Sequence, residues 1–196
     1  LFRINTRVPA LADQRLRAAL SHSIDREAIV NLVLRGGQIP AASLTPAGTA
    51  GYEPPAGLTY DLDKARELLA AAGFPGGEGA PEIELLFNTS ETHRLVAEAL
   101  QEMWRRDLGV TIRLHNMENK TVLESRRQGD YQMLRSVWIA DYADPSSFLD
   151  VFRSTSGNNY TGWADVEYDD LLFRVSRTTD PQQRFAMLRQ AEARLL

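Results

Sequence analysis

The feature that most constrains the fold is a strand, a long helix and a second strand between residues 82 and 114. Apolar side chains alternate over 83–87 and again over 110–114, a period of two that predicts strands. From Thr89 or Ser90 to Leu108 the spacing is helical, and Gly109 is expected to end the helix. Its predicted buried stripe is Leu95, Ala99, Leu100, Met103 and Trp104. Short connections between these elements favour a right-handed parallel βαβ unit.

The remaining elements are predicted from capping residues and from alternation. Aspartates that are expected to cap helices are Asp13, Asp25, Asp61 or Asp63, and Asp180. The second of these helices carries Ile29, Leu32 and Val33, and Gly36-Gly37 is predicted to end it. Other helices are expected at 120–128, 145–152 and 167–178, short strands at 2–5 and 131–137, and an irregular loop at 38–60. The whole predicts an α/β fold with a small mixed, partly parallel sheet flanked by helices.

Composition excludes several classes of protein. The 196-residue chain is 43% hydrophobic, which allows a sizeable core, and its net charge of −4 does not suit a nucleic-acid surface. No apolar run is long enough to span a bilayer, and without cysteine there are no disulfides. His22, His93 and His115 are scattered on separate elements, and phosphate-loop and dinucleotide motifs are absent. Neither a metal nor a cofactor is therefore expected.

The segment after the third predicted strand carries most of the chemically informative residues. Pro145 disfavours a helical conformation at Asp144 and suits the first turn of a following helix. Trp138, Asp141 and Tyr142 are therefore expected at or just beyond a strand end, where ligands bind in open α/β sheets. Two aromatic residues and two carboxylates here predict part of a pocket for a charged ligand.

Two arginines precede this segment, and they extend the prediction to a zwitterionic ligand. Arg126 lies on a predicted helix and Arg135 in a strand of otherwise apolar or neutral residues. Each candidate has a structural alternative: Arg126 could be a solvated charge beside Arg127, and Arg135 could form an internal salt bridge. Asp141 could be a cap or turn residue, and Trp138 and Tyr142 could be core or pocket wall. Asp144 is a better candidate for a helix N-cap than for a ligand contact.

Stretches that follow one known pattern run in order along nearly the whole chain. They are Asn5-Thr6, residues 13–20 and 24–30, Asn88-Thr89-Ser90, and residues 108–110, 126–129 and 138–149. Together they resemble the oligopeptide-binding proteins of bacterial ABC importers. These belong to the extracytoplasmic solute-binding family that also carries dipeptide, murein-peptide, nickel and haem binders. The resemblance implies a two-lobed periplasmic-binding-protein-like fold that closes on its ligand.

The resemblance also implies where the chain belongs in such a protein. Residues 1–196 are expected to form a single truncated C-terminal lobe, without the other lobe, the hinge and the final strands. The chain starts at Leu1 rather than Met, so any export signal or lipid anchor is expected outside it. The implied protein is a monomer in the periplasm or another extracytoplasmic location, with no enzymatic activity and no nucleic-acid partner. It would deliver short peptides to the membrane subunits of an ABC permease.

Site residues follow from the resemblance position by position. Asp141 matches an aspartate that pairs with the peptide α-ammonium, and Arg126 and Arg135 match arginines that bind its carboxylate. Such pairing is needed because removing one partner of a buried charge pair costs about 3–5 kcal/mol. Some members place a tryptophan that lines side-chain pockets where this chain has Asn119, a departure that bears on side-chain preference.

Two other functions are compatible with parts of this pattern. The same fold could bind another solute, such as a nickel chelate, haem or a sugar. A hydrolase could use Asp141 and Asp144 as an acid/base pair, as glycosidases do, and one carboxyl pKa would then have to be raised. The neighbouring arginines argue against the hydrolase, since they favour ionised carboxylates.

Overall fold

The computed structural model describes all 196 residues, which form two compact units. The first, called the sheet unit, comprises Leu1–Pro40 and Thr59–Ser136. The second, called the helical unit, comprises Ala41–Leu58 and Val137–Leu196. The loop predicted at 38–60 therefore contributes its central residues to the helical unit. That the whole chain is one truncated lobe of a larger protein stays a prediction.

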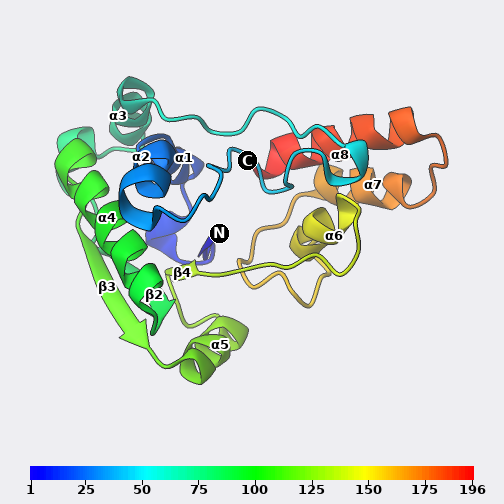
Figure 1. The fold of residues 1–196 in the computed structure, drawn as a ribbon. Coiled ribbons are helices and arrows are strands. Elements are labelled where there is room, and N and C mark those ends of the chain that lie inside the picture. Colours follow the sequence, from blue (N-terminus) through cyan, green and yellow to red (C-terminus); the bar gives the residue numbers. More distant parts are fainter. The chain divides into compact units, whose positions relative to one another are not determined.

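The sheet unit contains four strands in the order β1-β4-β2-β3 (Figure 1). Their bounds are Phe2–Ile4 for β1, Ile83–Asn88 for β2, Ile112–Met117 for β3 and Met133–Arg135 for β4. Strand β2 pairs in parallel with both β3 and β4, and β1 pairs antiparallel with β4. The predicted βαβ unit and the mixed, partly parallel sheet are confirmed. Because β2 and β4 are parallel neighbours, their carboxyl ends lie at the same edge of the sheet.

The helices of this unit lie around the sheet, and most of them bury side chains in one apolar core. They are α1 (Gln14–His22), α2 (Arg26–Ala28), a π-helix (Ile29–Leu34), α3 (Leu62–Ala71), α4 (Glu91–Leu108) and α5 (Asn119–Gln128), with 3-10 turns at Pro9–Leu11 and Pro75–Gly77. Trp104 of α4 is buried in this core, and its indole N–H donates to the Leu20 carbonyl at 2.9 Å. The predicted stripe on α4 is wrong at Leu95, which is 37% exposed, because the buried face runs through Ala97 and Leu100.

Aspartate caps fix the helix starts where the sequence predicts them. The carboxylates of Asp13, Asp25 and Asp61 accept backbone N–H groups at the starts of α1, α2 and α3. Asp180 does the same for α8 (Pro181–Leu195), which has proline at its first position. Each cap satisfies a donor that has no partner within its helix.

The end of the second helix differs from the prediction. Helix α2 continues as the π-helix, in which Ile29 is buried and Leu32 is exposed. Arg35, rather than Gly36-Gly37, adopts the left-handed conformation that ends it, with φ of 52°. The Arg35 guanidinium Nε donates to the Leu32 carbonyl at 2.9 Å, which satisfies an acceptor in the last turn.

The helical unit is built around a second core. It contains α6 (Ser146–Leu149), α7 (Val166–Val175) and α8, with 3-10 turns at Thr49–Gly51 and Asp150–Phe152. Leu149, Tyr168, Leu172 and Leu188 are buried in this core. The helix predicted at 145–152 is thus a short α-helix followed by a 3-10 turn. Helices α7 and α8 lie side by side and bury one face of each (Figure 1).

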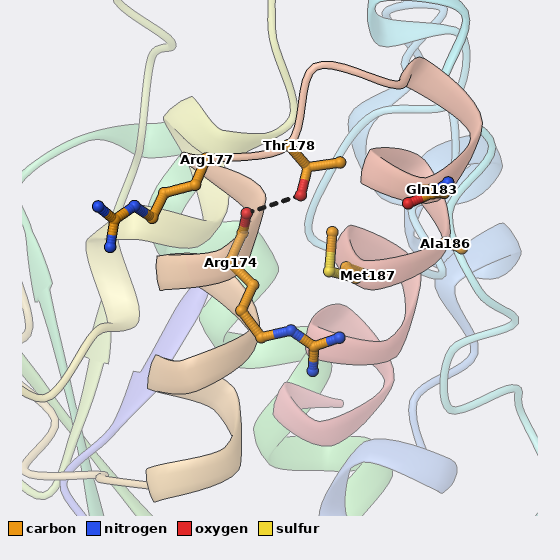
Figure 2. A pocket seen from close by; sticks show the side chains of 6 residues that line it. All are labelled: Arg174, Arg177, Thr178, Gln183, Ala186 and Met187. Carbon is orange, nitrogen blue, oxygen red and sulfur yellow. Dashed lines mark hydrogen bonds between the residues drawn. The ribbon is translucent and has the colours of Figure 1, made fainter.

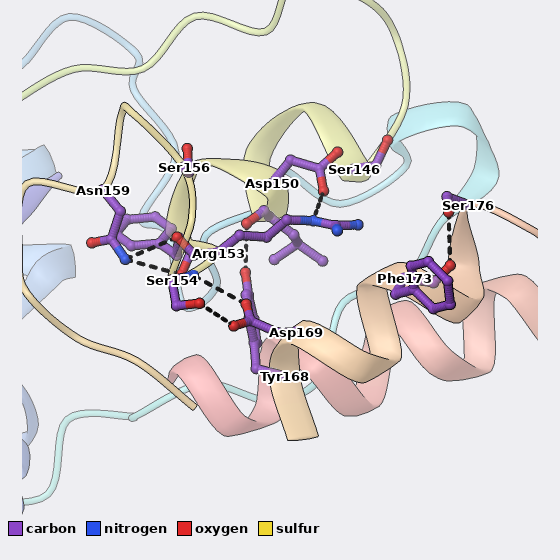
Figure 3. A network of polar contacts seen from close by, with 12 residues as sticks. Ser146, Asp150, Arg153, Ser154, Ser156, Asn159, Tyr168, Asp169, Phe173 and Ser176 are labelled. Atoms are coloured by element: carbon purple, nitrogen blue, oxygen red, sulfur yellow. Dashed lines mark hydrogen bonds and ion pairs between the residues drawn. The ribbon is translucent and has the colours of Figure 1, made fainter. Parts of the chain in front are cut away.

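Polar contacts order the loop at 154–162 (Figure 3). The Asn159 amide donates to three carbonyls, of which the shortest contact, 2.8 Å, is to Trp163. The Ser154 N–H donates to the Asp169 carboxylate of α7 at 3.0 Å, and the Ser154 hydroxyl donates to the same carboxylate. The loop is irregular in conformation, but its polar groups are tied to the helices that flank it.

Candidate functional site

The six predicted site residues divide between the two units. Trp138, Asp141 and Tyr142 belong to the helical unit, whereas the others, Asn119, Arg126 and Arg135, belong to the sheet unit.

Residues 136–145, called the acidic loop, follow β4 without regular secondary structure, as predicted. Asp141 is exposed, and its carboxylate takes part in no hydrogen bond or ion pair. Tyr142 is 53% exposed, with its hydroxyl 3.4 Å from the Ser146 hydroxyl. Trp138 is half-buried and packs against the helical core, and whether it also lines a ligand pocket stays a prediction. The local fold therefore leaves the charge of Asp141 available.

Ser147, on α6, forms the contacts that hold the acidic loop in place. Its side-chain oxygen accepts the backbone N–H of Asp141 at 3.1 Å, and its carbonyl accepts the Trp138 indole N–H at 2.7 Å. Ser147 is buried, so water competes only weakly for the groups that form these two hydrogen bonds. One buried residue thus fixes two points of the loop that carries Asp141.

Asp144 has a structural role, as predicted. The N-cap position of α6 is Pro145, one residue later than predicted, and the Asp144 Oδ1 accepts the backbone N–H of Ser146, the first helical residue, at 2.9 Å. Arg184 of α8 donates to both Asp144 oxygens, at 2.7 and 2.8 Å. Burial acts to raise the pKa of Asp144, but the hydrogen bonds from Arg184 and Ser146 outweigh it and hold that pKa below its ordinary value. This direction is opposite to what a hydrolytic general acid requires.

Arg135, the last residue of β4, is a half-buried cation without a carboxylate partner in the sheet unit. No hydrogen bond or ion pair holds its guanidinium, and burial lowers its pKa. His93 lies near it, in the first turns of α4, and its Nδ1 is buried without a hydrogen-bond partner. Burial first, and then the charge of Arg135, lower the pKa of His93, while a backbone contact with Asn88 opposes them.

The sequence pattern does not mark His93 as a site residue. A lone histidine near the start of an amphipathic helix carries no signal by itself. The topology carries one: α4 begins just after β2, and β2 and β4 end at the same sheet edge. The proximity of His93 to Arg135 follows from this arrangement. The sequence pattern alone does not show that β2 and β4 are neighbouring strands.

Arg126 and Asn119 lie near opposite ends of α5. Arg126 is half-buried and close to the buried Tyr131, whose pKa is raised by burial and lowered in part by Arg3, Arg7 and Arg126. Arg126 is therefore not a solvated surface charge. Its neighbour Arg127 is exposed and lies 3.5 Å from a Glu124 oxygen. Asn119 is exposed at the first position of the helix, seven residues before Arg126. At 1.5 Å per residue this separates the two by about 10 Å along the helix axis.

The surface of the α7–α8 pair has a shallow hollow of about 420 Å³, distant in sequence from the acidic loop (Figure 2). It is lined by Arg174, Arg177, Thr178, Gln183, Ala186 and Met187, and no predicted site residue is among them. It is open to solvent.

No three acidic, histidine or cysteine side chains gather as a metal site would require. None of the helices combines the length and apolarity needed to cross a membrane.

Comparison with protein families decides the class of this chain. The model that describes bacterial extracellular solute-binding proteins, family 5 (middle region), matches residues 1–160. The chain belongs to this family. A curated relative, the periplasmic murein peptide-binding protein MppA of Escherichia coli, is 36% identical over 201 residues. The oligopeptide-binding protein OppA of Bacillus subtilis is 35% identical over 199 residues. The chain covers 37% and 36% of these two relatives, so it corresponds to less than two fifths of each.

Solved structures of this solute-binding family have the same fold. MppA in its unliganded open form superposes with a TM-score of 0.92 at 37% identity, over 99% of this chain and 39% of that one. Haemophilus influenzae OppA in complex with RPPGFSPFR gives 0.90 at 31% identity, over 99% of this chain and 39% of that one. The predicted periplasmic-binding-protein-like α/β class is confirmed, and the resemblance to the oligopeptide-binding type is confirmed with it.

Proposed function

We propose that the protein containing this chain is the extracytoplasmic peptide-binding component of an ABC importer. Asp141 pairs with the α-ammonium of a short peptide, and Arg135, with Arg126, binds its carboxylate. The protein passes the peptide to the membrane subunits of the importer. Support comes from relatives named as murein peptide-binding and oligopeptide-binding proteins, and from a related structure in complex with a nine-residue peptide.

The observation that carries the proposal is the state of Arg135. A guanidinium that is half-buried and has no counter-ion in its own unit loses hydration without gaining an ion pair. A ligand carboxylate supplies that ion pair, and the planar fork of arginine suits its two oxygens. The imidazole of His93 lies close enough for the charge of Arg135 to lower its pKa, and we propose that it faces the same anion. Arg135 and His93 together form an anion site at the end of β4.

Asp141 supports the other half of the proposal. Its backbone is held by Ser147, while its carboxylate is exposed and not used by the local fold. Asp144, three residues later, forms hydrogen bonds with Arg184 and Ser146, so its charge is already paired within the fold. Within the acidic loop, Asp141 is therefore the carboxylate suited to a ligand ammonium.

Calorimetry on the full-length protein tests this function. Tri- to pentapeptides are titrated with free termini, with an acetylated amino end and with an amidated carboxyl end. Asp141→Asn is expected to weaken binding of free-amino peptides and to leave acetylated peptides unchanged. The matched control is Asp63→Asn, since Asp63 is a fully exposed aspartate on α3. Equal affinity of the wild-type protein for free and blocked peptides would exclude recognition through terminal charges.

One relative favours a second candidate ligand class. The probable deoxycholate-binding periplasmic protein YgiS of E. coli is 36% identical over 200 residues. An organic carboxylate of this kind can use the anion site at Arg135 but has no ammonium for Asp141. If this is the ligand class, Arg135→Gln abolishes binding of the carboxylate and Asp141→Asn does not change it. The two variants therefore separate peptides from other carboxylates.

A further inference from the structure

Asp141 lies in a segment with no ladder of backbone hydrogen bonds, so its position depends on a few specific contacts. Two of them come from Ser147, which accepts the Asp141 N–H through its hydroxyl oxygen and the Trp138 indole through its carbonyl. The Ser147 N–H in turn donates to the Asp144 carbonyl at 3.0 Å. Ser147 therefore connects the middle of the loop with both of its flanks.

The carboxyl end of the loop is held from a different helix. Arg184 projects from α8 and forms a bidentate pair with Asp144, in which both side chains are about three quarters buried. The Asp144 N–H donates to the Tyr142 carbonyl at 2.9 Å, which closes a tight turn directly after Asp141. The planar fork of Arg184 fixes both oxygens of Asp144 and so fixes the direction of that turn.

We propose that Ser147 and Arg184 are positioning residues for ligand binding, which hold the acidic loop so that the Asp141 carboxylate is pre-organised for a ligand ammonium. The inference rests on the proposed function of Asp141 and adds two residues that need not touch the ligand. Neither carries the charge that recognises the ammonium. Ser147 sets the backbone of Asp141, and Arg184 sets the turn that follows.

Pre-organisation matters here because an exposed loop aspartate would otherwise pay the entropy of ordering when the ligand binds. Binding is tighter when that cost is met during folding rather than at each binding event. Ser147 is buried, and the Arg184–Asp144 pair is protected enough to keep one geometry, unlike most surface pairs. Loss of either contact should release Asp141 without removing its charge.

The test is calorimetry on the full-length protein with a tripeptide that has a free amino end and with its N-acetylated form. The measured quantity is the ratio of the two affinities. Ser147→Ala removes the acceptor for the Asp141 N–H and is expected to lower the ratio about 5- to 10-fold, as one lost hydrogen bond would. Arg184→Met is expected to lower it by a similar factor, and Arg184→Lys, which keeps a charge on Asp144, by less.

Matched controls separate positioning from general destabilisation. Ser176→Ala removes one side-chain hydrogen bond at the end of α7, and Arg174→Met removes a loose, exposed pair with Asp170. Both should leave the ratio unchanged. A purely structural role would lower the unfolding midpoint of the Ser147 and Arg184 variants without changing the ratio, and that result would overturn the inference.

Asp141→Asn, measured in parallel, tells two failures apart. If it lowers the ratio and the Ser147 and Arg184 variants do not, the proposed function stands and the positioning inference is wrong. If Asp141→Asn leaves the ratio unchanged, the role of Asp141 itself is wrong, and the positioning inference fails with it.

Discussion

Glu192 offers a quantitative test of how the helical unit is held together. Its side chain is 0% exposed in α8, and both carboxylate oxygens accept hydrogen bonds from the loop at residues 41–58. One comes from the Thr45 backbone N–H at 2.7 Å and the other from the Tyr52 hydroxyl at 2.9 Å. Thr45 and Tyr52 are also fully buried, so bulk water does not reach these donors in the folded protein. Glu192→Ala therefore removes the acceptor of two buried donors at once.

The magnitude follows from these contacts. Each buried donor that loses its partner costs about 1–3 kcal/mol, so the two together cost about 2–6 kcal/mol. Removal of the carboxylate also relieves the cost of burying a polar group, which offsets part of this loss. We expect Glu192→Ala to lower the free energy of unfolding by about 2–4 kcal/mol.

Urea unfolding followed by circular dichroism measures this loss, and a double-mutant cycle with Tyr52→Phe assigns it. In the Tyr52→Phe background there is no hydroxyl to leave unpaired, so Glu192→Ala should cost about 1–3 kcal/mol less. Hydrogen exchange at the Thr45 amide should accelerate in Glu192→Ala alone and in the double variant, but much less in Tyr52→Phe. A loss below about 0.5 kcal/mol, or independence of the two substitutions, would refute this account of the contact.

Three further predictions concern the charged side chains. Arg135→Gln should weaken binding of free-carboxylate peptides by about 2–4 kcal/mol, about 30- to 700-fold in calorimetric Kd, whereas Arg127→Gln at the surface should not change it. Because burial and Arg135 hold the pKa of His93 below its ordinary value, protonation adds a cation to the anion site only on acidification. Affinity for these peptides should rise as the pH falls below about 6.5, and His93→Gln should flatten the profile. The pKa of Asp144 is held low in the folded state, so its stabilisation is present above about pH 4 and is lost as the pH falls through the folded value. Arg184→Met should reduce this loss in urea titrations between about pH 2 and 5, and an unchanged acid profile would contradict the assignment.

Local patterns predicted much of the sheet unit because they have local physical causes. The period of two in 83–87, the helix up to Gly109 and the strand after it required the βαβ unit, and the structure contains it. Aspartate caps located helix starts, since each satisfies a donor within three residues of itself. The predicted helix ends were less accurate than the predicted helix starts. Arg35 ended the π-helix before Gly36-Gly37 because its own side chain satisfied a carbonyl of the last turn.

Long-range contacts account for what the sequence did not predict. The division into two units depends on Thr45 and Tyr52 meeting Glu192, residues about 140 positions apart, and no periodicity records such a pairing. The proximity of His93 to Arg135 likewise depends on β4 lying beside β2, although α4, β3 and α5 separate these two strands in sequence. Candidate residues could be named from local pattern and resemblance, whereas their partners required the fold.

The same distinction explains why two aspartates in one loop are suited to different tasks. The charge of Asp144 is paired within the fold with Arg184. Its lowered pKa keeps it deprotonated, so it has no proton to donate to a substrate. Asp141 is held through its backbone N–H, which donates to the Ser147 hydroxyl oxygen, and its carboxylate has no internal cation. Among the arginines, Arg135 resembles Asp141 because no residue of opposite charge pairs with it. Arg127, in contrast, has Glu124 beside it. A charge that the fold holds in place without neutralising it costs free energy in the unliganded protein, and a ligand of opposite charge recovers that cost on binding.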